Sequence, residues 1–283
     1  MLKFTKMHGC GNDYIYFNCF SQKAENPEKL SIALSDRHFG IGGDGIVLIC
    51  PSDVCDAKMR MFNADGSEGK MCGNAIRCVG KYLSDEGIVS GDEITVETLS
   101  GNKILKLKKS GDGKVLSVTV NMGKAEFEAE KIPVTFDEKE VIGKKVTINE
   151  KEEKITCVSM GNPHCVIFTD DTDSLNLEKI GPKYENFKLF PDRINTEFVE
   201  IIDDKTLKMR VWERGSGETL ACGTGACAVV SAAVANGICK KDTDVTVKLL
   251  GGDLKIKYTD DAVFMTGGAT RVFDGEVDET KIL

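Results

Sequence analysis

The sequence lacks the features by which chains bind metals or build disulfide frameworks. Its 283 residues include three histidines (His8, His38 and His164) and no C-x-x-C pair. Eleven cysteines are an odd number for a set of bridges, and no histidine stands at metal-ligand spacing from them. We therefore expect no metal site and a protein of the reducing cytoplasm.

Long apolar runs and clusters of one charge are also missing. No run approaches membrane-spanning length, and the first eleven residues do not read as a signal peptide. The net charge of −8 is spread along the chain, and the lysines of 103–109 alternate with Ile and Leu as in a half-solvated strand. The sequence thus predicts a globular protein with neither a membrane nor a nucleic-acid partner.

What the sequence does contain is one Cys-Gly pair in each half, 150 residues apart. Cys72-Gly73 and Cys222-Gly223 each open a segment that reads as a helix and ends at a Gly-Ile pair. Unpaired backbone N–H groups and the dipole at a helix N-terminus favour an anion, so we expect the pKa of each thiol to fall toward neutrality.

Other segments repeat in the same order. Gly-Asn precedes an apolar run at 11–12 and again at 161–162, segment 59–62 matches 209–212, and a hairpin follows each predicted helix. Such a series indicates duplication of a whole domain. We expect a first domain over residues 1–117, joined by the tail 267–283, and a second over 118–266.

Each half reads as short alternating strands around one helix, which predicts an α/β (α+β) fold. The helix expected over 223–236 is apolar nearly all round, so a curved sheet or barrel must enclose it. The helix over 73–86 carries Arg77, Lys81 and Asp85 outside its apolar side and is expected to be less enclosed. A further helix is expected from Pro27 to about Arg37, with Asn26 as its N-cap.

Duplicated domains normally face each other across a pseudo-two-fold axis, so both thiols could bracket one carbon atom in a cleft. One thiolate would then remove a proton from one face while the opposite thiol protonates the other, which suits stereoinversion. The backbone N–H groups of Gly73-Asn74 and Gly223-Thr224 could bind a carboxylate. Taken singly, a Cys before Gly is more often structural, and an Asn beside Gly is more often a turn residue.

Five segments together closely resemble the diaminopimelate epimerases. They are Phe-Asn-Ala-Asp-Gly-Ser at 62–67, Met-Cys-Gly-Asn at 71–74, Gly-Asn-Pro-His at 161–164, Trp-Glu-Arg-Gly at 212–215 and Ala-Cys-Gly-Thr-Gly at 221–225. The opening segment 8–13 and the closing segment 265–267 fit as well, so the resemblance covers essentially the whole chain.

The resemblance implies a cofactor-free, cytoplasmic epimerase that interconverts LL- and meso-diaminopimelate for lysine and cell-wall synthesis, usually as a homodimer. Its fold would be two similar domains, each a curved sheet or barrel around a central helix, with the site between them. Cys72 and Cys222 would be the two bases, with Cys72 taking the proton of the LL isomer.

The resemblance also assigns the surrounding residues. The reacting carboxylate would bind to the backbone of Gly73, Asn74, Gly223 and Thr224. The non-reacting end would be held by Asn12, Asn63, Asn162, Asn195 and Arg214. Glu213 and His164 would contact the reacting centre and help set the protonation of the thiols.

Two alternatives remain open. A proline or hydroxyproline racemase-type enzyme shares both cysteines but typically carries His where this chain has Asn74. A non-enzymatic thiol redox switch would use Cys72 and Cys222 as a reversible disulfide. Exchange of the substrate α-proton in deuterated water distinguishes an epimerase from such a switch.

Overall fold

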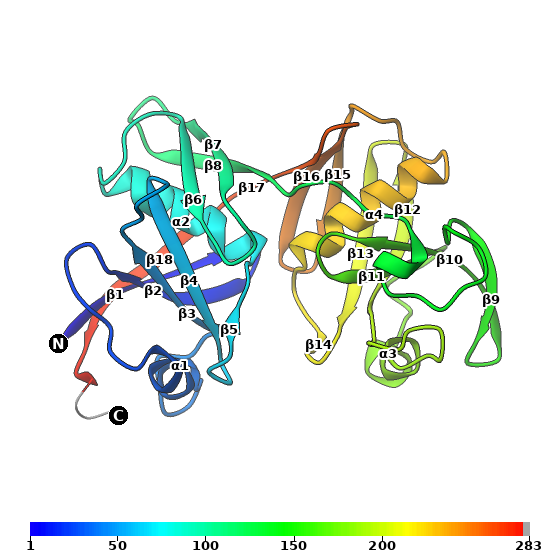
Figure 1. Cartoon of the computed structure of the whole chain (residues 1–283), viewed down its shortest axis with the longest axis horizontal. Helices are drawn as coiled ribbons and strands as arrows, with labels where there is room; N and C mark the ends of the chain where they lie inside the picture. The colour runs from blue at the N-terminus through cyan, green and yellow to red at the C-terminus, as the bar shows by residue number, and fades with distance from the viewer. Residues whose placement is uncertain (280–283) are drawn as a thin grey trace. The chain divides into compact units, whose positions relative to one another are not determined.

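The computed structural model describes residues 1–279 and divides the chain into two compact units. The first consists of Met1–Val120 together with the segment from Thr266 onward, and the second of Asn121–Met265 (Figure 1). The last four residues of the tail predicted over 267–283 lie outside the described residues.

The first unit is a mixed sheet. Its strands are β1 (Leu2–Gly9), β2 (Asn12–Asn18), β3 (Gly45–Cys50), β4 (Ala57–Asn63), β5 (Glu68–Gly69), β6 (Glu93–Glu97), β7 (Lys103–Lys109), β8 (Val115–Asn121) and β18 (Thr270–Val277). They pair in the order β18–β1–β2–β3–β4–β6–β7–β8, with β5 beside β4. The tail thus returns to the first unit as β18, antiparallel to β1.

The second unit repeats this arrangement. Its strands are β9 (Lys144–Ile148), β10 (Lys151–Ser159), β11 (Pro163–Thr169), β12 (Asn195–Asp203), β13 (Thr206–Glu213), β14 (Gly217–Glu218), β15 (Asp244–Leu249) and β16 (Gly252–Tyr258), and β17 (Val263–Gly267) leads back to the first unit. The pairing order is β9–β10–β11–β12–β13–β15–β16, with β14 beside β13. The predicted α+β class and the duplication are both confirmed.

One helix in each unit begins directly after a Cys and packs on the sheet. These are α2 (Gly73–Asp85) and α4 (Gly223–Ala235), each one residue shorter than predicted (Figure 1). Helix α4 contacts strands from β10 to β16 that are not neighbours in the sheet, so the sheet curves around it. The even distribution of Ala and Val on α4 is therefore explained by burial on all sides.

Helix α2 is more enclosed than the sequence suggested, and the expectation for Arg77 is wrong. Arg77 is fully buried. Its guanidinium donates to the carbonyl oxygens of Gly73 at 3.0 Å and Gly268 at 3.2 Å, which compensates for its removal from water. Lys81 and Asp85, four and eight residues after Arg77, form an ion pair of 2.8 Å with little exposure.

Two shorter helices, α1 (Pro27–Ser35) and α3 (Leu177–Glu185), again stand 150 residues apart. Pro27 begins α1 as predicted, but Asn26 does not cap it with its side chain. Asn26 has a left-handed backbone conformation (φ 45°), which Asn tolerates better than most residues, and its side chain makes no cap bond. In α3 the equivalent Asn176 does accept from the N–H of Lys179.

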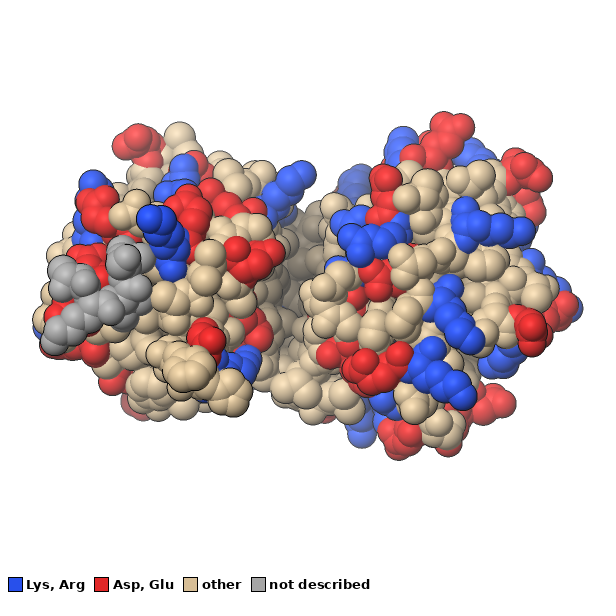
Figure 2. Space-filling model, turned by 90° about the horizontal axis from the view of Figure 1, so that it is seen from below, with Lys and Arg blue, Asp and Glu red and all other residues tan. Residues whose placement is uncertain are grey.

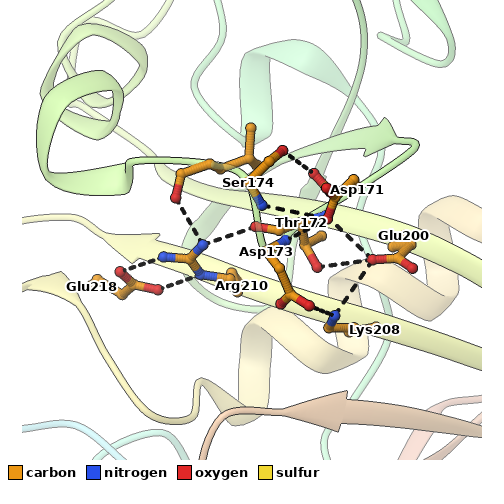
Figure 3. A network of polar contacts seen from close by, with 9 residues as sticks. Asp171, Thr172, Asp173, Ser174, Glu200, Lys208, Arg210 and Glu218 are labelled. Atoms are coloured by element: carbon orange, nitrogen blue, oxygen red, sulfur yellow. Dashed lines mark hydrogen bonds and ion pairs between the residues drawn. The ribbon is translucent and has the colours of Figure 1, made fainter.

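Each unit contains a bidentate Arg–Glu ion pair, and the two pairs stand at corresponding positions. Arg60 Nε lies 2.7 Å from Glu68 Oε1, and Arg210 Nε lies 2.7 Å from Glu218 Oε1. The second pair belongs to a larger network, in which Arg210 also donates to the carbonyl oxygens of Thr172 and Leu175 (Figure 3). This network fixes the β13–β14 hairpin, which leads into Cys222, against the loop before α3.

The surface carries both charges side by side. Figure 2 shows Lys and Arg interspersed with Asp and Glu on the visible face of each unit, consistent with the even distribution of charge along the sequence. No helix among residues 1–279 is long and apolar enough to cross a membrane.

Candidate active site

Cys72 and Cys222 occupy the N-cap positions of α2 and α4. Cys72 has an extended backbone (φ −131°, ψ 123°), and its Sγ lies 3.5 Å from the backbone N of Ala75. Cys222 is similar (φ −115°, ψ 110°), with Sγ 3.3 Å from the N of Gly225. Each sulfur thus takes the place of the oxygen that Ser or Asp supplies at an ordinary N-cap.

The residues that follow each cysteine form the first helical turn. Gly73, Asn74 and Gly223 are buried, and Thr224 is half-buried with its Oγ1 3.5 Å from Cys222 Sγ. Backbone N–H groups in a first turn have no acceptor within their own helix, so each helix start can bind an anion. The structure therefore places all four predicted carboxylate-binding residues beside a thiol.

The two thiols have different surroundings. Cys72 is half-buried, and its Sγ lies 3.2 Å from Asn12 Oδ1. Cys222 is buried at 5% exposure, and burial raises the pKa of its thiol well above the ordinary value. The negative charges of Glu213 and Glu197 raise the Cys222 pKa further, whereas Thr224 and the Gly225 N–H oppose the shift. The expectation that its helix start would lower this pKa is wrong, because one helical turn of N–H groups does not outweigh burial beside two carboxylates.

Glu213 and His164 both belong to the second unit, and Glu213 interacts with Cys222 and with His164. Burial raises the pKa of the Glu213 carboxyl, which also accepts a hydrogen bond from the Thr219 hydroxyl. His164 is fully buried between Glu197 and Asn162: its Nδ1 lies 2.7 Å from Glu197 Oε1, and its Nε2 lies 3.0 Å from Asn162 Oδ1.

Glu197 was missed by the sequence interpretation. Its carboxyl is fully buried, and Oε2 has no hydrogen-bond partner among residues 1–279. Glu197 Oε1 lies 2.7 Å, and Cys222 Sγ 3.2 Å, from the point that a Cβ on Gly225 would occupy, so these two atoms are within about 6 Å of each other. The repeat carried a signal: position 47 of the first unit is Val and position 75 is Ala, whereas the second unit has Glu197 and Gly225.

Asp44 was missed as well. Its Oδ2 accepts from Asn12 Nδ2 at 2.7 Å and from the backbone N of Asp13 at 3.0 Å, and its Oδ1 pairs with Arg37 at 2.9 Å. Asn12 therefore connects the thiol of Cys72 to a carboxylate outside the predicted set. The signal that could have found Asp44 is weak, because an Asp among glycines reads as a turn residue.

The remaining predicted residues lie at strand ends. Asn63 ends β4, and its Nδ2 donates to Ser67 Oγ at 3.0 Å. Asn195 is buried, accepts from the backbone N of Arg214 at 2.9 Å and donates to the carbonyl of Pro163 at 2.7 Å. Arg214 donates to the carbonyl of Asp192 at 2.9 Å. Asn195 thus positions the backbone of Arg214, a predicted site residue, and that of Pro163.

Within residues 1–279, no group of three or more His, Cys, Asp or Glu side chains is arranged to hold a metal ion. All eleven cysteines fall within this range and lie outside any disulfide bond.

Comparisons with known proteins agree with each other. A family model described as diaminopimelate epimerase matches residues 4–128 and 156–272. A diaminopimelate epimerase of Acetivibrio thermocellus is 58% identical, over 98% of this chain and 99% of that protein. One of Methanococcus maripaludis is 56% identical, over 98% of this chain and the full length of that protein. The crystal structure of a probable proline racemase from Agrobacterium radiobacter has a TM-score of 0.74 and 14% identity, covering 98% of this chain and 93% of that one, and so shares the fold.

The surroundings of Cys222 predict how its reactivity depends on pH. At the pH at which this thiol ionises, Glu213 is charged, so Glu213→Gln removes a repelling charge and lowers the thiol pKa. We expect the midpoint of Cys222 alkylation by a small reagent, followed by peptide mass spectrometry, to fall by about one pH unit. Glu153→Gln is the matched control, since Glu153 is a buried carboxylate of the same unit bound to Tyr184. An unchanged or raised midpoint in Glu213→Gln would contradict the conclusion that the charge of Glu213 raises the pKa of Cys222.

Proposed function

The chain belongs to the diaminopimelate epimerase family, and from this we propose that it interconverts LL- and meso-2,6-diaminopimelate. The observation that carries the proposal is the pair of N-cap thiols at equivalent positions of two repeated units. The reaction would serve lysine biosynthesis and the supply of meso-diaminopimelate for the cell wall.

In the proposed mechanism, Cys72 and Cys222 act on opposite faces of one α-carbon. In the LL direction the Cys72 thiolate removes the α-proton, and the Cys222 thiol delivers its own proton to the other face, leaving Cys72 as thiol and Cys222 as thiolate. The raised pKa of Cys222 supports this assignment, because a thiol that resists ionisation carries its proton before turnover. The same property makes its thiolate a stronger base for the meso direction.

The acidity of the α-carbon would come from the two helix starts. Removing the proton places negative charge on the adjacent carboxylate, where backbone N–H groups of Gly73-Asn74 and Gly223-Thr224 would receive it. Such donors are already oriented, so they stabilise developing charge without reorganisation. The two thiols and these N–H groups supply the acid, base and anion-binding functions from the chain itself, so we propose that the enzyme uses no cofactor.

The non-reacting amino acid centre would be held by Asn12, Asn63, Asn162, Asn195 and Arg214. Amide groups and a guanidinium together offer acceptors for an ammonium and donors for a carboxylate. Asn195 would contribute mainly through the backbone of Arg214, to which it is already bonded. His164 and Glu213 would contact the reacting centre and Cys222.

We further propose a cytoplasmic homodimer that acts on the free small molecule and binds no nucleic acid. Eleven cysteines without a disulfide bond are typical of a reducing compartment. On the face that Figure 2 shows, the mixed charges do not form the basic patch of a nucleic-acid-binding protein.

A proline racemase-type activity is the second candidate, because a probable proline racemase shares the fold. Asn74 argues against it, since the racemases that the sequence resembles typically have His there. The diamino acid also makes better use of the amides at 63, 162 and 195 than a ring would.

Loss of either thiol should abolish inversion. In Cys72→Ser and in Cys222→Ser the hydroxyl is nearly isosteric but a far weaker acid than the thiol, so we expect turnover to fall by at least about 10²–10⁴-fold, the range for a general acid or base. Cys50→Ser is the control and should alter stability at most. Formation of meso from LL-diaminopimelate is measured under reductant, and retention of more than about a tenth of turnover in either variant contradicts a two-base mechanism.

Recognition of the distal centre predicts the substrate range. A site built from paired polar groups rejects analogues that leave these groups unsatisfied. We expect α-deuterium incorporation with LL- and meso-diaminopimelate in deuterated water, and poor incorporation with the DD isomer, lysine and proline. Arg214→Ala should weaken use of the LL isomer strongly. Equal exchange with LL-diaminopimelate, lysine and proline would favour the racemase alternative.

A further inference from the structure

We propose that Asp44 is a positioning residue: it holds the side-chain amide of Asn12 with the carbonyl oxygen toward the thiol of Cys72. The proposal concerns the protonation of this thiol. Only the consequence of that protonation for turnover rests on the proposed function. Neither the family resemblance nor the comparisons assign Asp44 a role.

The contacts form a continuous chain from carboxylate to sulfur. Asn12 Nδ2 donates to Asp44 Oδ2 at 2.7 Å, and Asn12 Oδ1 lies 3.2 Å from Cys72 Sγ. Asp44 is itself held from two sides, because Oδ2 also accepts the N–H of Asp13 and Oδ1 pairs with Arg37. The carboxylate therefore cannot turn without losing several charge-assisted bonds.

The chemistry of the groups fixes the orientation of the amide. An ionised carboxylate only accepts hydrogen bonds, so the NH₂ group of Asn12 must face Asp44. Its carbonyl oxygen then faces the sulfur. This oxygen can accept from the S–H of Cys72, but toward a thiolate it presents lone pairs and no donor. Asn12 in this orientation favours the thiol, whereas the N–H of Ala75 at 3.5 Å favours the thiolate.

The second unit shows what happens without such a carboxylate. Asn162 stands 150 residues after Asn12, yet its Oδ1 bonds to His164 Nε2 at 3.0 Å. The sulfur of Cys222 instead has Thr224 and Gly225 as hydrogen-bond neighbours. The position equivalent to Asp44 is Ile194, a fully buried apolar residue. A carboxylate bonded directly to this asparagine is thus present in the first unit, at Asn12, and absent, among the described residues, at the equivalent Asn162.

Other ionisable groups of the first unit surround Cys72. Tyr16 on β2 is fully buried, and burial raises its pKa well above the usual range. On α2, burial raises the pKa of Cys78 to about 11, and Arg77 donates to the carbonyl of Gly73. Neither Tyr16 nor Cys78 changes charge near neutral pH. Removing Asp44 should therefore change the pKa of Cys72 either by freeing the Asn12 amide or by removing the charge of Asp44. A double-mutant cycle with Asn12 separates these two effects.

The test is the pH dependence of Cys72 alkylation by iodoacetamide, followed on the Cys72 peptide by mass spectrometry. In Asp44→Ala the freed amide can turn an N–H toward the thiolate. We expect the midpoint to fall by about one pH unit, as for a hydrogen bond to a charged group. In an Asn12→Ala background, the same Asp44→Ala change should produce no shift beyond experimental error. Arg37→Ala is the matched control: it removes the exposed cation that pairs with Asp44 and leaves the Asn12–Asp44 bond in place.

Either of two results with Asp44→Ala would overturn the proposal. One is an unchanged midpoint in Asp44→Ala; the other is an equal shift with and without Asn12, which would show a charge effect alone. If Asp44→Ala does not fold by circular dichroism, Asp44→Asn decides. Its carbonyl can still accept from both Asn12 and Asp13, so its midpoint should match wild type, and a one-unit fall there contradicts the proposal. Alkylation needs no substrate, so failure to epimerise diaminopimelate would refute the proposed function and leave this result standing.

Discussion

The rest of the site depends on a cysteine sulfur that caps a buried helix. An N-cap sulfur is held by the backbone geometry of the turn and by an N–H two or three residues on, so its position does not depend on a flexible side chain. The same turn exposes the free N–H groups that can bind a carboxylate. The same helix start therefore provides both the thiol and the anion-binding N–H groups. Because the domain is duplicated, the chain has two such helix starts.

Duplication gives the two thiols the same position, but their neighbours have diverged. Around Cys222 the second unit places Glu197 and Glu213, and burial together with the charges of these two carboxylates raises the pKa of the thiol. Around Cys72 the first unit places an oriented amide backed by Asp44 and Arg37. An epimerase with two bases needs one thiol and one thiolate at the start of each turnover. The unequal surroundings give the two thiols different contacts, and the proposed mechanism needs the Cys72 thiol to ionise more readily than the Cys222 thiol.

Most of the frame could be predicted from the sequence. The two central helices, the hairpins after them and the duplication all follow from periodicity and from the offset of 150 residues. The interactions that set the protonation of the thiols could not be predicted from the sequence. Arg77 reads as a surface residue until the carbonyls of Gly73 and Gly268 are seen to satisfy it. Glu197 reads as one exposed position of a strand, and its burial depends on His164 from a neighbouring strand. The burial of both side chains depends on partners that are distant in the sequence. The local sequence pattern carries no information about those partners.

The central claim is that one thiol from each unit acts on the same carbon atom. The most direct measurement is disulfide mapping of air-oxidised, inactive protein by mass spectrometry, before and after reductant. Two thiols that bracket one carbon can come within bonding distance in the absence of substrate, so the account predicts a bond between Cys72 and Cys222, with activity restored when it is reduced. Inactive protein in which both thiols remain free, or in which each is bonded to a cysteine of its own unit, would contradict the account.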